Sequence, residues 1–122
     1  KPNMGTRSFP YSGGLTTCEA LLMGVPVITK PGSTFAGRHS YTHLYNAGLQ
    51  DWIAHSEEEY INLAKYWSQN IGLLSVLRHR LRDQLLNSPL CDAERFAANF
   101  YQKLREIWTA KCEETQNQQE AN

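Results

Sequence analysis

The chain has 122 residues, which is enough for one domain with a modest core. Its 41% hydrophobic content is too high for a disordered chain. Twelve basic side chains balance twelve acidic ones, so charge gives no reason to expect binding to nucleic acid or to an anionic membrane. No apolar run approaches the roughly 20 residues that a membrane-spanning helix needs.

The three cysteines argue against both a disulfide framework and a zinc site. They are odd in number and widely spaced, with no C-x-x-C motif, at Cys18, Cys91 and Cys112. We therefore expect free thiols, a cytoplasmic protein, and no metal or other cofactor. Cys18 falls at a predicted helix N-terminus, where the pKa of a thiol can drop, but no histidine close in sequence could act as its base. No catalytic cysteine is predicted.

The first third of the chain predicts a turn, a helix and a buried strand. Residues 1–7 lack the apolar core of a signal peptide and are interpreted as an N-terminal tail, which cloning could have contributed. Two glycines at 13 and 14 predict a turn. Thr16 and Glu19 have capping-box spacing and open a helix that Gly24 ends. Residues 25–29 are apolar and β-branched, which is typical of a buried strand.

The rest of the chain predicts one more strand and four helices. A helix over residues 35–46 is closed by Gly48, and residues 49–54 form a candidate short strand. Ser56 and Glu59 form a second capping box and open the next helix. The following helix carries an apolar stripe, which consists of Leu74, Leu77, Leu81 and Leu85.

The C-terminal segment predicts a final helix and a polar tail. Asn87, Ser88 and Pro89 break the leucine-striped helix, and Asp92 caps the last one. The stripe of this last helix consists of Phe96, Phe100, Leu104, Ile107 and Trp108. Part of this stripe is expected to be exposed, and the tail over residues 111–122 is expected to fray.

Strands that alternate with helices predict right-handed βαβ units and a small parallel sheet, so the expected fold class is α/β with a helical C-terminus. Two or three strands are few for such a fold. We therefore expect the chain to be part of a larger protein.

The segment around the paired glycines could bind an anion. A helix N-terminus carries unpaired N–H groups and a partial positive charge, and glycines before it let a phosphate approach the backbone. The first turn would offer the N–H groups of Leu15, Thr16 and Thr17. The segment is neither a Walker A loop nor a G-x-G-x-x-G motif. Glu19 could cap the helix or accept hydrogen bonds from vicinal hydroxyls. Spacing alone slightly favours the cap.

Several separated blocks resemble one enzyme family. The first, "GGLTTCEALLMGVPVIT", resembles the nucleotide-sugar motif in the C-terminal domain of GT-B glycosyltransferases. The next, "PGSTFAGRHSYTHLYNAGLQDWIA", resembles the O-linked N-acetylglucosamine transferase family, especially its bacterial tetratricopeptide-repeat members and the SPINDLY proteins. A third, "NSPLCDAERFAANFYQKLREIW", resembles the C-terminal helices of that family. The resemblance covers about residues 8–108.

The resemblance implies that residues 8–110 are the C-terminal part of a GT-B donor-binding domain, a partial Rossmann-like half. The implied ligand is a UDP-sugar, usually UDP-N-acetylglucosamine, which is a substrate and not a cofactor. The diphosphate would lie against Gly13, Gly14, Leu15, Thr16 and Thr17, and Glu19 would hold the ribose hydroxyls. Animal members carry a His where Gly14 stands and an Asp where Glu19 stands.

The family also implies a reaction, inverting transfer of the sugar to Ser or Thr hydroxyls of a protein acceptor. A catalytic Lys and His, the uracil-reading segment and the acceptor-presenting repeats have no counterpart in these residues. No catalytic residue is therefore assigned, and the chain alone is not expected to turn over. Two alternatives stay open: another GT-B enzyme with a different donor or acceptor, and a non-catalytic phosphate-binding or interaction module.

Six other side chains could have a functional or a structural role. Arg38 could approach donor phosphates or anchor the donor loop, but an exposed position or an ion pair within the domain is favoured. His39 and His43 have helical spacing compatible with a metal, yet two ligands with no further one nearby do not make a site. Trp52, Trp67 and Trp108 are interpreted as packing residues.

Overall fold

The computed structural model describes residues 4–6 and 11–120. The chain divides into two compact units, Lys1–Cys91 and Asp92–Asn122, and each is described by itself.

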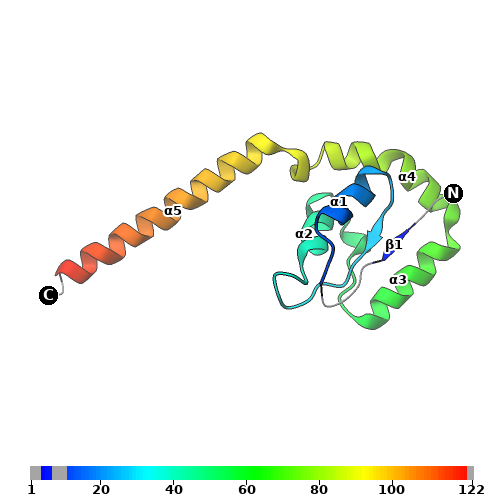
Figure 1. The fold of residues 1–122 in the computed structure, drawn as a ribbon, viewed down its shortest axis with the longest axis horizontal. Helices are drawn as coiled ribbons and strands as arrows, with labels where there is room; N and C mark the ends of the chain where they lie inside the picture. Colours follow the sequence, from blue (N-terminus) through cyan, green and yellow to red (C-terminus); the bar gives the residue numbers. More distant parts are fainter. Residues whose placement is uncertain (1–3, 7–10, 121–122) are drawn as a thin grey trace. The chain divides into compact units, whose positions relative to one another are not determined.

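The first unit contains a βαβ arrangement with a very small parallel sheet (Figure 1). Strand β1 (Gly5–Thr6) pairs in parallel with β2 (Val27–Ile28), and helix α1 (Leu15–Leu22) connects them. An isolated parallel bridge between Thr29 and Ile53 joins the end of β2 to a third segment of the chain. Among the described residues the unit is therefore mostly helical, with far less sheet than the α/β prediction implied.

The predicted strand over residues 49–54 is wrong. Gln50–Trp52 form a 3₁₀ turn, η1, because the Trp52 N–H donates to the Leu49 carbonyl (3.0 Å) and the Ile53 N–H to the Gln50 carbonyl (3.0 Å). Ile53 alone is paired like a strand residue. The apolar positions of this segment are buried in either conformation, so the burial pattern could not distinguish a strand from a turn.

The two glycines predicted to end helices both adopt left-handed backbone angles. Gly24 follows α1 with φ +76°, and Gly48 follows helix α2 (His39–Asn46) with φ +73°. Helix α2 begins four residues later than predicted. Two successive turns, from Thr34 to Gly37 and from Phe35 to Arg38, precede it and place Phe35 in the loop.

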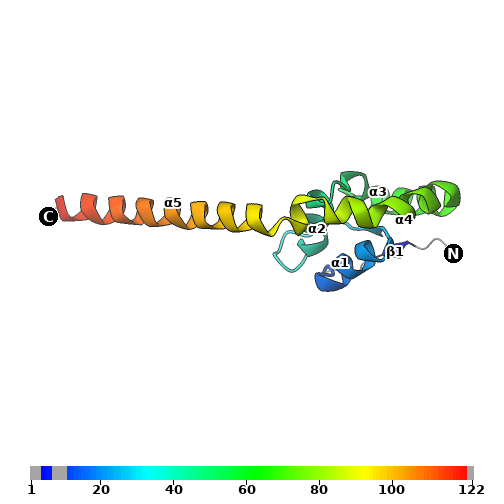
Figure 2. The ribbon, with the colours of Figure 1, turned by 90° about the horizontal axis from the view of Figure 1, so that it is seen from above.

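Helices α3 (Glu57–Gln69) and α4 (Ile71–Leu86) complete the core. The Ser56 hydroxyl accepts the Glu59 N–H (3.1 Å), which confirms the predicted cap, and the Glu59 carboxylate accepts the His55 N–H (2.7 Å). Helices α1 and α4 pack together, and α1 and α3 both contact β2. Seen from above, α4 runs between α1 and α3 (Figure 2). The predicted α4 stripe is buried and joins a cluster made of Leu21, Ile28, Leu44, Ala47, Leu49, Trp52, Ile53, Leu74, Leu77, Leu81 and Leu85.

Helix α4 ends where predicted, and a 3₁₀ turn, η2 (Pro89–Cys91), follows it. The second unit is built on helix α5 (Ala93–Glu120). Asp92 caps it as predicted, since its carboxylate accepts the Arg95 N–H (3.0 Å).

Helix α5 continues through the predicted polar tail to Glu120, and Lys111 forms an ion pair with Glu114 (3.3 Å). Every member of the predicted stripe is exposed, namely Phe96, Phe100, Leu104, Ile107 and Trp108. Within residues 4–6 and 11–120, no helix combines the length and apolar character needed to cross a membrane.

Candidate functional site

Two helix N-termini lie at the same edge of the strand pair. Helix α1 follows β1 and helix α2 follows β2, and the two strands are parallel. Both connections therefore leave from the carboxyl ends of the strands, where open parallel sheets hold their ligands.

Helix α1 begins at the paired glycines, without the predicted capping box. Gly14 is its N-cap, with φ −88°, and no side chain caps the helix. Since the helix begins at Leu15, Thr16 already lies inside its first turn, and Thr16 and Glu19 are both exposed. Glu19 is therefore not explained by a capping role.

Three hydroxyls hold residues 13 and 14, the glycine segment, in place. The Thr17 hydroxyl donates to the Gly13 carbonyl (2.8 Å), and the Ser40 hydroxyl reaches the same carbonyl (2.8 Å). These two hydroxyl oxygens lie 2.9 Å apart. The Ser12 hydroxyl accepts the Ser40 N–H (3.3 Å), and the Ser12 N–H donates to the Ala36 carbonyl (2.9 Å). This network joins the start of α1 to the start of α2.

The network separates the predicted site residues into two groups. Thr17 is fully buried, so its hydroxyl serves the structure and does not face solvent. Its N–H donates to the Gly14 carbonyl (3.0 Å). By contrast, Leu15 is 74% exposed at the first helical position, where the N–H points out of the helix end.

The space in front of Gly14 is open. A Cβ added there would meet no heavy atom within 4 Å. The absence of a side chain at Gly14 leaves the first turn of α1 accessible. Glu19 lies about 160° around the helix axis from Thr17, at 100° per residue, so it is on the face turned away from α2.

An exposed aromatic cluster beside this segment was missed by the sequence analysis. Phe35 packs edge-on against His39, with ring centroids 4.6 Å apart. The Tyr11 ring lies tilted against the same His39 ring, with centroids 5.8 Å apart. We name Tyr11, Phe35 and His39 the aromatic cluster. Its members come from two segments that meet only in the fold, so no spacing in the sequence predicts it.

The Arg38 side chain contacts residues close to it in sequence. Its guanidinium donates to the Gly32 carbonyl (3.4 Å) and lies 4.7 Å from the centre of the Tyr41 ring. Arg38 is exposed, as the favoured interpretation predicted. No group of three metal-ligating side chains occurs in the described part of the chain, and His39 and His43 remain a pair.

The thiol of Cys18 does not have the lowered pKa that its place near a helix N-terminus suggested. Burial raises its pKa, and the neighbouring Cys91 raises it further. A protonated thiol is a weak nucleophile, so Cys18 is unsuited to covalent catalysis.

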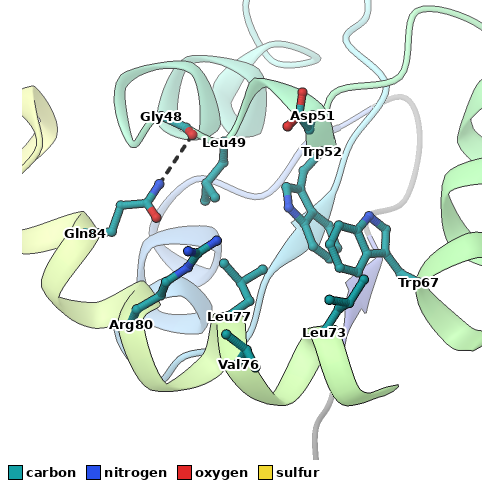
Figure 3. Close-up of a pocket in the computed structure, with 10 residues that line it drawn as sticks. All are labelled: Gly48, Leu49, Asp51, Trp52, Trp67, Leu73, Val76, Leu77, Arg80 and Gln84. Atoms are coloured by element: carbon teal, nitrogen blue, oxygen red, sulfur yellow. Dashed lines mark hydrogen bonds between the residues drawn. The ribbon is translucent and has the colours of Figure 1, made fainter. Parts of the chain in front are cut away.

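A separate pocket of about 200 Å³ lies at the other end of α2 (Figure 3). Trp52 and Trp67 stack there with ring centroids 4.3 Å apart, and Gln84 donates to the Gly48 carbonyl (3.3 Å). Trp52 is buried and Trp67 is half-buried, which confirms both as packing residues. Because Gly48 follows the C-terminus of α2, this pocket is not the glycine segment's site.

Comparisons with known proteins identify the family. The sequence model of Glycosyl transferase family 41 matches residues 8–100. A protein of Petunia hybrida, "Probable UDP-N-acetylglucosamine--peptide N-acetylglucosaminyltransferase SPINDLY", is 40% identical over 106 residues, which are 87% of this chain and 11% of that protein. The protein of the same name from Arabidopsis thaliana is 38% identical over 86% of this chain and 12% of its own length.

A solved structure agrees with these relatives. A mutant of the Thermobaculum terrenum O-GlcNAc transferase matches with a TM-score of 0.74 and 39% identity, over 84% of this chain and 20% of that chain. The chain therefore spans only a small part of the proteins that it matches. It belongs to glycosyl transferase family 41.

Proposed function

We propose that this chain binds the diphosphate of a UDP-sugar donor, as part of the Rossmann-like C-terminal domain of a GT-B glycosyltransferase. The observation that carries the proposal is the start of α1: paired glycines, an exposed first turn and open space before Gly14, at the carboxyl ends of parallel strands. Family membership supplies the class of ligand, because the relatives are named for UDP-N-acetylglucosamine.

Each residue of the site has a proposed part. The backbone of Gly13, Gly14 and Leu15 lets the diphosphate approach, and the Leu15 N–H donates to it. Thr16 adds an exposed hydroxyl in the same turn. The buried Thr17 contributes by fixing the Gly13 carbonyl, so that the first turn keeps its shape without a ligand.

Glu19 is the proposed ribose ligand. A carboxylate can accept two hydrogen bonds from vicinal hydroxyls. Glu19 is exposed and is not occupied in capping its own helix, so both of its oxygens are available for this contact.

The proposed reaction is inverting transfer of the sugar to Ser or Thr hydroxyls of a protein. In that reaction the bond between the sugar and the diphosphate breaks, and negative charge develops on the departing UDP. Fixed N–H dipoles at the start of α1 would stabilise this charge without a metal. The residues that activate the acceptor are not assigned to this chain.

The direct test is a titration of the ¹⁵N-labelled chain with UDP, followed by NMR. The amide signals of residues 13–19 should shift in a saturable way, whereas the signals of Gly48 and Gln84, at the other end of α2, should not. Shifts spread evenly over both regions, or none at millimolar UDP, would contradict the proposal.

A further inference from the structure

We propose that the aromatic cluster of Tyr11, Phe35 and His39 binds the sugar ring of the donor. This inference rests on the proposed function, since it takes the diphosphate to lie at the start of α1. It adds a site, and the chemical class of its ligand, a pyranose ring with an apolar face.

The aromatic cluster is accessible to solvent and is linked to the glycine segment. Phe35 is 83% exposed and Tyr11 is 58% exposed, and neither belongs to the buried core. The Ser12 N–H and hydroxyl both donate to the Ala36 carbonyl, at 2.9 and 3.2 Å. These two bonds tie the residue after Tyr11 to the residue after Phe35, so the two segments that carry the rings are joined at the residue before Gly13.

The side of α1 on which the cluster lies determines which part of the donor it would meet. The Thr17 side chain faces α2 through its contact with Ser40, and Glu19 lies on the opposite face of α1. A UDP-sugar is linear, with ribose at one end of the diphosphate and the sugar at the other. If Glu19 holds the ribose, the diphosphate crosses the helix end, and the sugar lies toward α2.

The chemistry of the cluster suits a pyranose. One face of such a ring presents mainly C–H groups, which pack well on an aromatic face such as that of Phe35. The ring edge presents hydroxyls, for which the Tyr11 hydroxyl and the His39 ring nitrogens are hydrogen-bond partners. The nucleobase is not the expected occupant, because it is attached to the ribose on the Glu19 side.

The test compares UDP with UDP-N-acetylglucosamine as ligands of the ¹⁵N- and ¹³C-labelled chain. Both should shift the amides of residues 13–19. Only the nucleotide sugar should shift the ring signals of Tyr11, Phe35 and His39, and saturation of the aromatic protons should transfer to the sugar protons and not to the uracil.

A substitution separates the sugar contact from the diphosphate contact. Phe35→Ala should raise the Kd of UDP-N-acetylglucosamine about three- to tenfold, and Phe35→Leu should have a similar effect, because both remove the ring. Neither should change the Kd of UDP. The matched control is Tyr45→Ala, which removes a ring that is 54% exposed in the last turn of α2 and should change neither Kd.

The outcomes distinguish this inference from the proposed function. If UDP shifts residues 13–19 but the nucleotide sugar gives no further shift in the cluster and Phe35→Ala binds it normally, this inference is wrong and the donor site stands. If UDP fails to shift residues 13–19, the proposed function fails, and this inference fails with it.

Discussion

The hydroxyl oxygens of Thr17 and Ser40 lie 2.9 Å apart in the buried region between α1 and α2. Each hydroxyl also lies 2.8 Å from the Gly13 carbonyl oxygen, which can accept a hydrogen bond from both. This arrangement fixes the backbone just before the first turn of α1.

Removing one member of this network should destabilise the fold. Thr17→Val keeps the shape of the side chain but removes its hydroxyl, and we expect it to lower the free energy of unfolding by about 1–2 kcal/mol. Thr42→Val is the matched control, since the Thr42 hydroxyl bonds the Arg38 carbonyl (3.2 Å) at an exposed position of α2. Urea denaturation of both variants measures the difference, and equal losses would show that the buried network contributes nothing special.

Gly24 should not tolerate a side chain. Its φ is +76°, and a Cβ there would lie 2.8 Å from the backbone oxygen of Arg78 in α4. Gly24→Ala should therefore cost at least about 2 kcal/mol of stability. Gly72→Ala is the control: Gly72 lies in α4 with open space around it, and alanine should be neutral or slightly stabilising there. Thermal unfolding compares them, and a Gly24→Ala protein as stable as the parent would contradict the packing.

Glu19 and Glu59 both have the spacing of a capping box in the sequence, but their replacement by alanine should have different effects. Glu19→Ala should weaken UDP binding at least about tenfold and leave stability nearly unchanged, because Glu19 caps nothing. Glu59→Ala should lower stability by about 0.5–1 kcal/mol and leave UDP binding unchanged, because its carboxylate accepts the His55 N–H. Calorimetric titration and urea denaturation measure the two effects. A Glu19→Ala protein that is less stable but binds UDP normally would contradict the proposed ribose contact and indicate a structural role for Glu19.

His43 should make stability depend on pH. Its Nδ1 is buried and has no hydrogen-bond partner among the described residues. Burial, with a further contribution from His39, lowers the pKa of His43 below its ordinary value of about 6.5. The unfolded chain therefore binds a proton more readily than the folded one as the pH falls.

The sign of this effect follows from proton linkage. The contribution of His43 to stability is fully present above about pH 6.5 and is lost as the pH falls toward the lower folded pKa. His43→Leu removes the titrating group, and we expect it to reduce the loss of stability between pH 7 and pH 5. Urea midpoints across this range test it, and identical slopes for parent and variant would contradict the assignment.

Local signals in the sequence predicted much of this fold. The leucine stripe of α4, the two glycine stops and the Ser56 cap depend on neighbours within a few residues, and all are confirmed. The strand predicted over residues 49–54 failed because a 3₁₀ turn buries the same side chains.

The candidate site was harder to predict in full. The glycine segment was visible as a motif, but the inward position of Thr17 depends on Ser40, which is 23 residues away. The aromatic cluster likewise joins residues 11 and 39 through the fold. Contacts of this kind leave no periodicity or spacing in the chain.

The most direct test of the donor site is the affinity of Leu15→Pro for UDP. Proline is favoured at the first helical position, and the exposed Leu15 side chain contributes little to the core, so the variant should fold with nearly the stability of the parent. The variant lacks the N–H group that we propose donates to the diphosphate. Its Kd for UDP should therefore rise about tenfold or more, because a hydrogen bond to a charged group is lost. A folded Leu15→Pro protein that binds UDP as tightly as the parent would contradict the account.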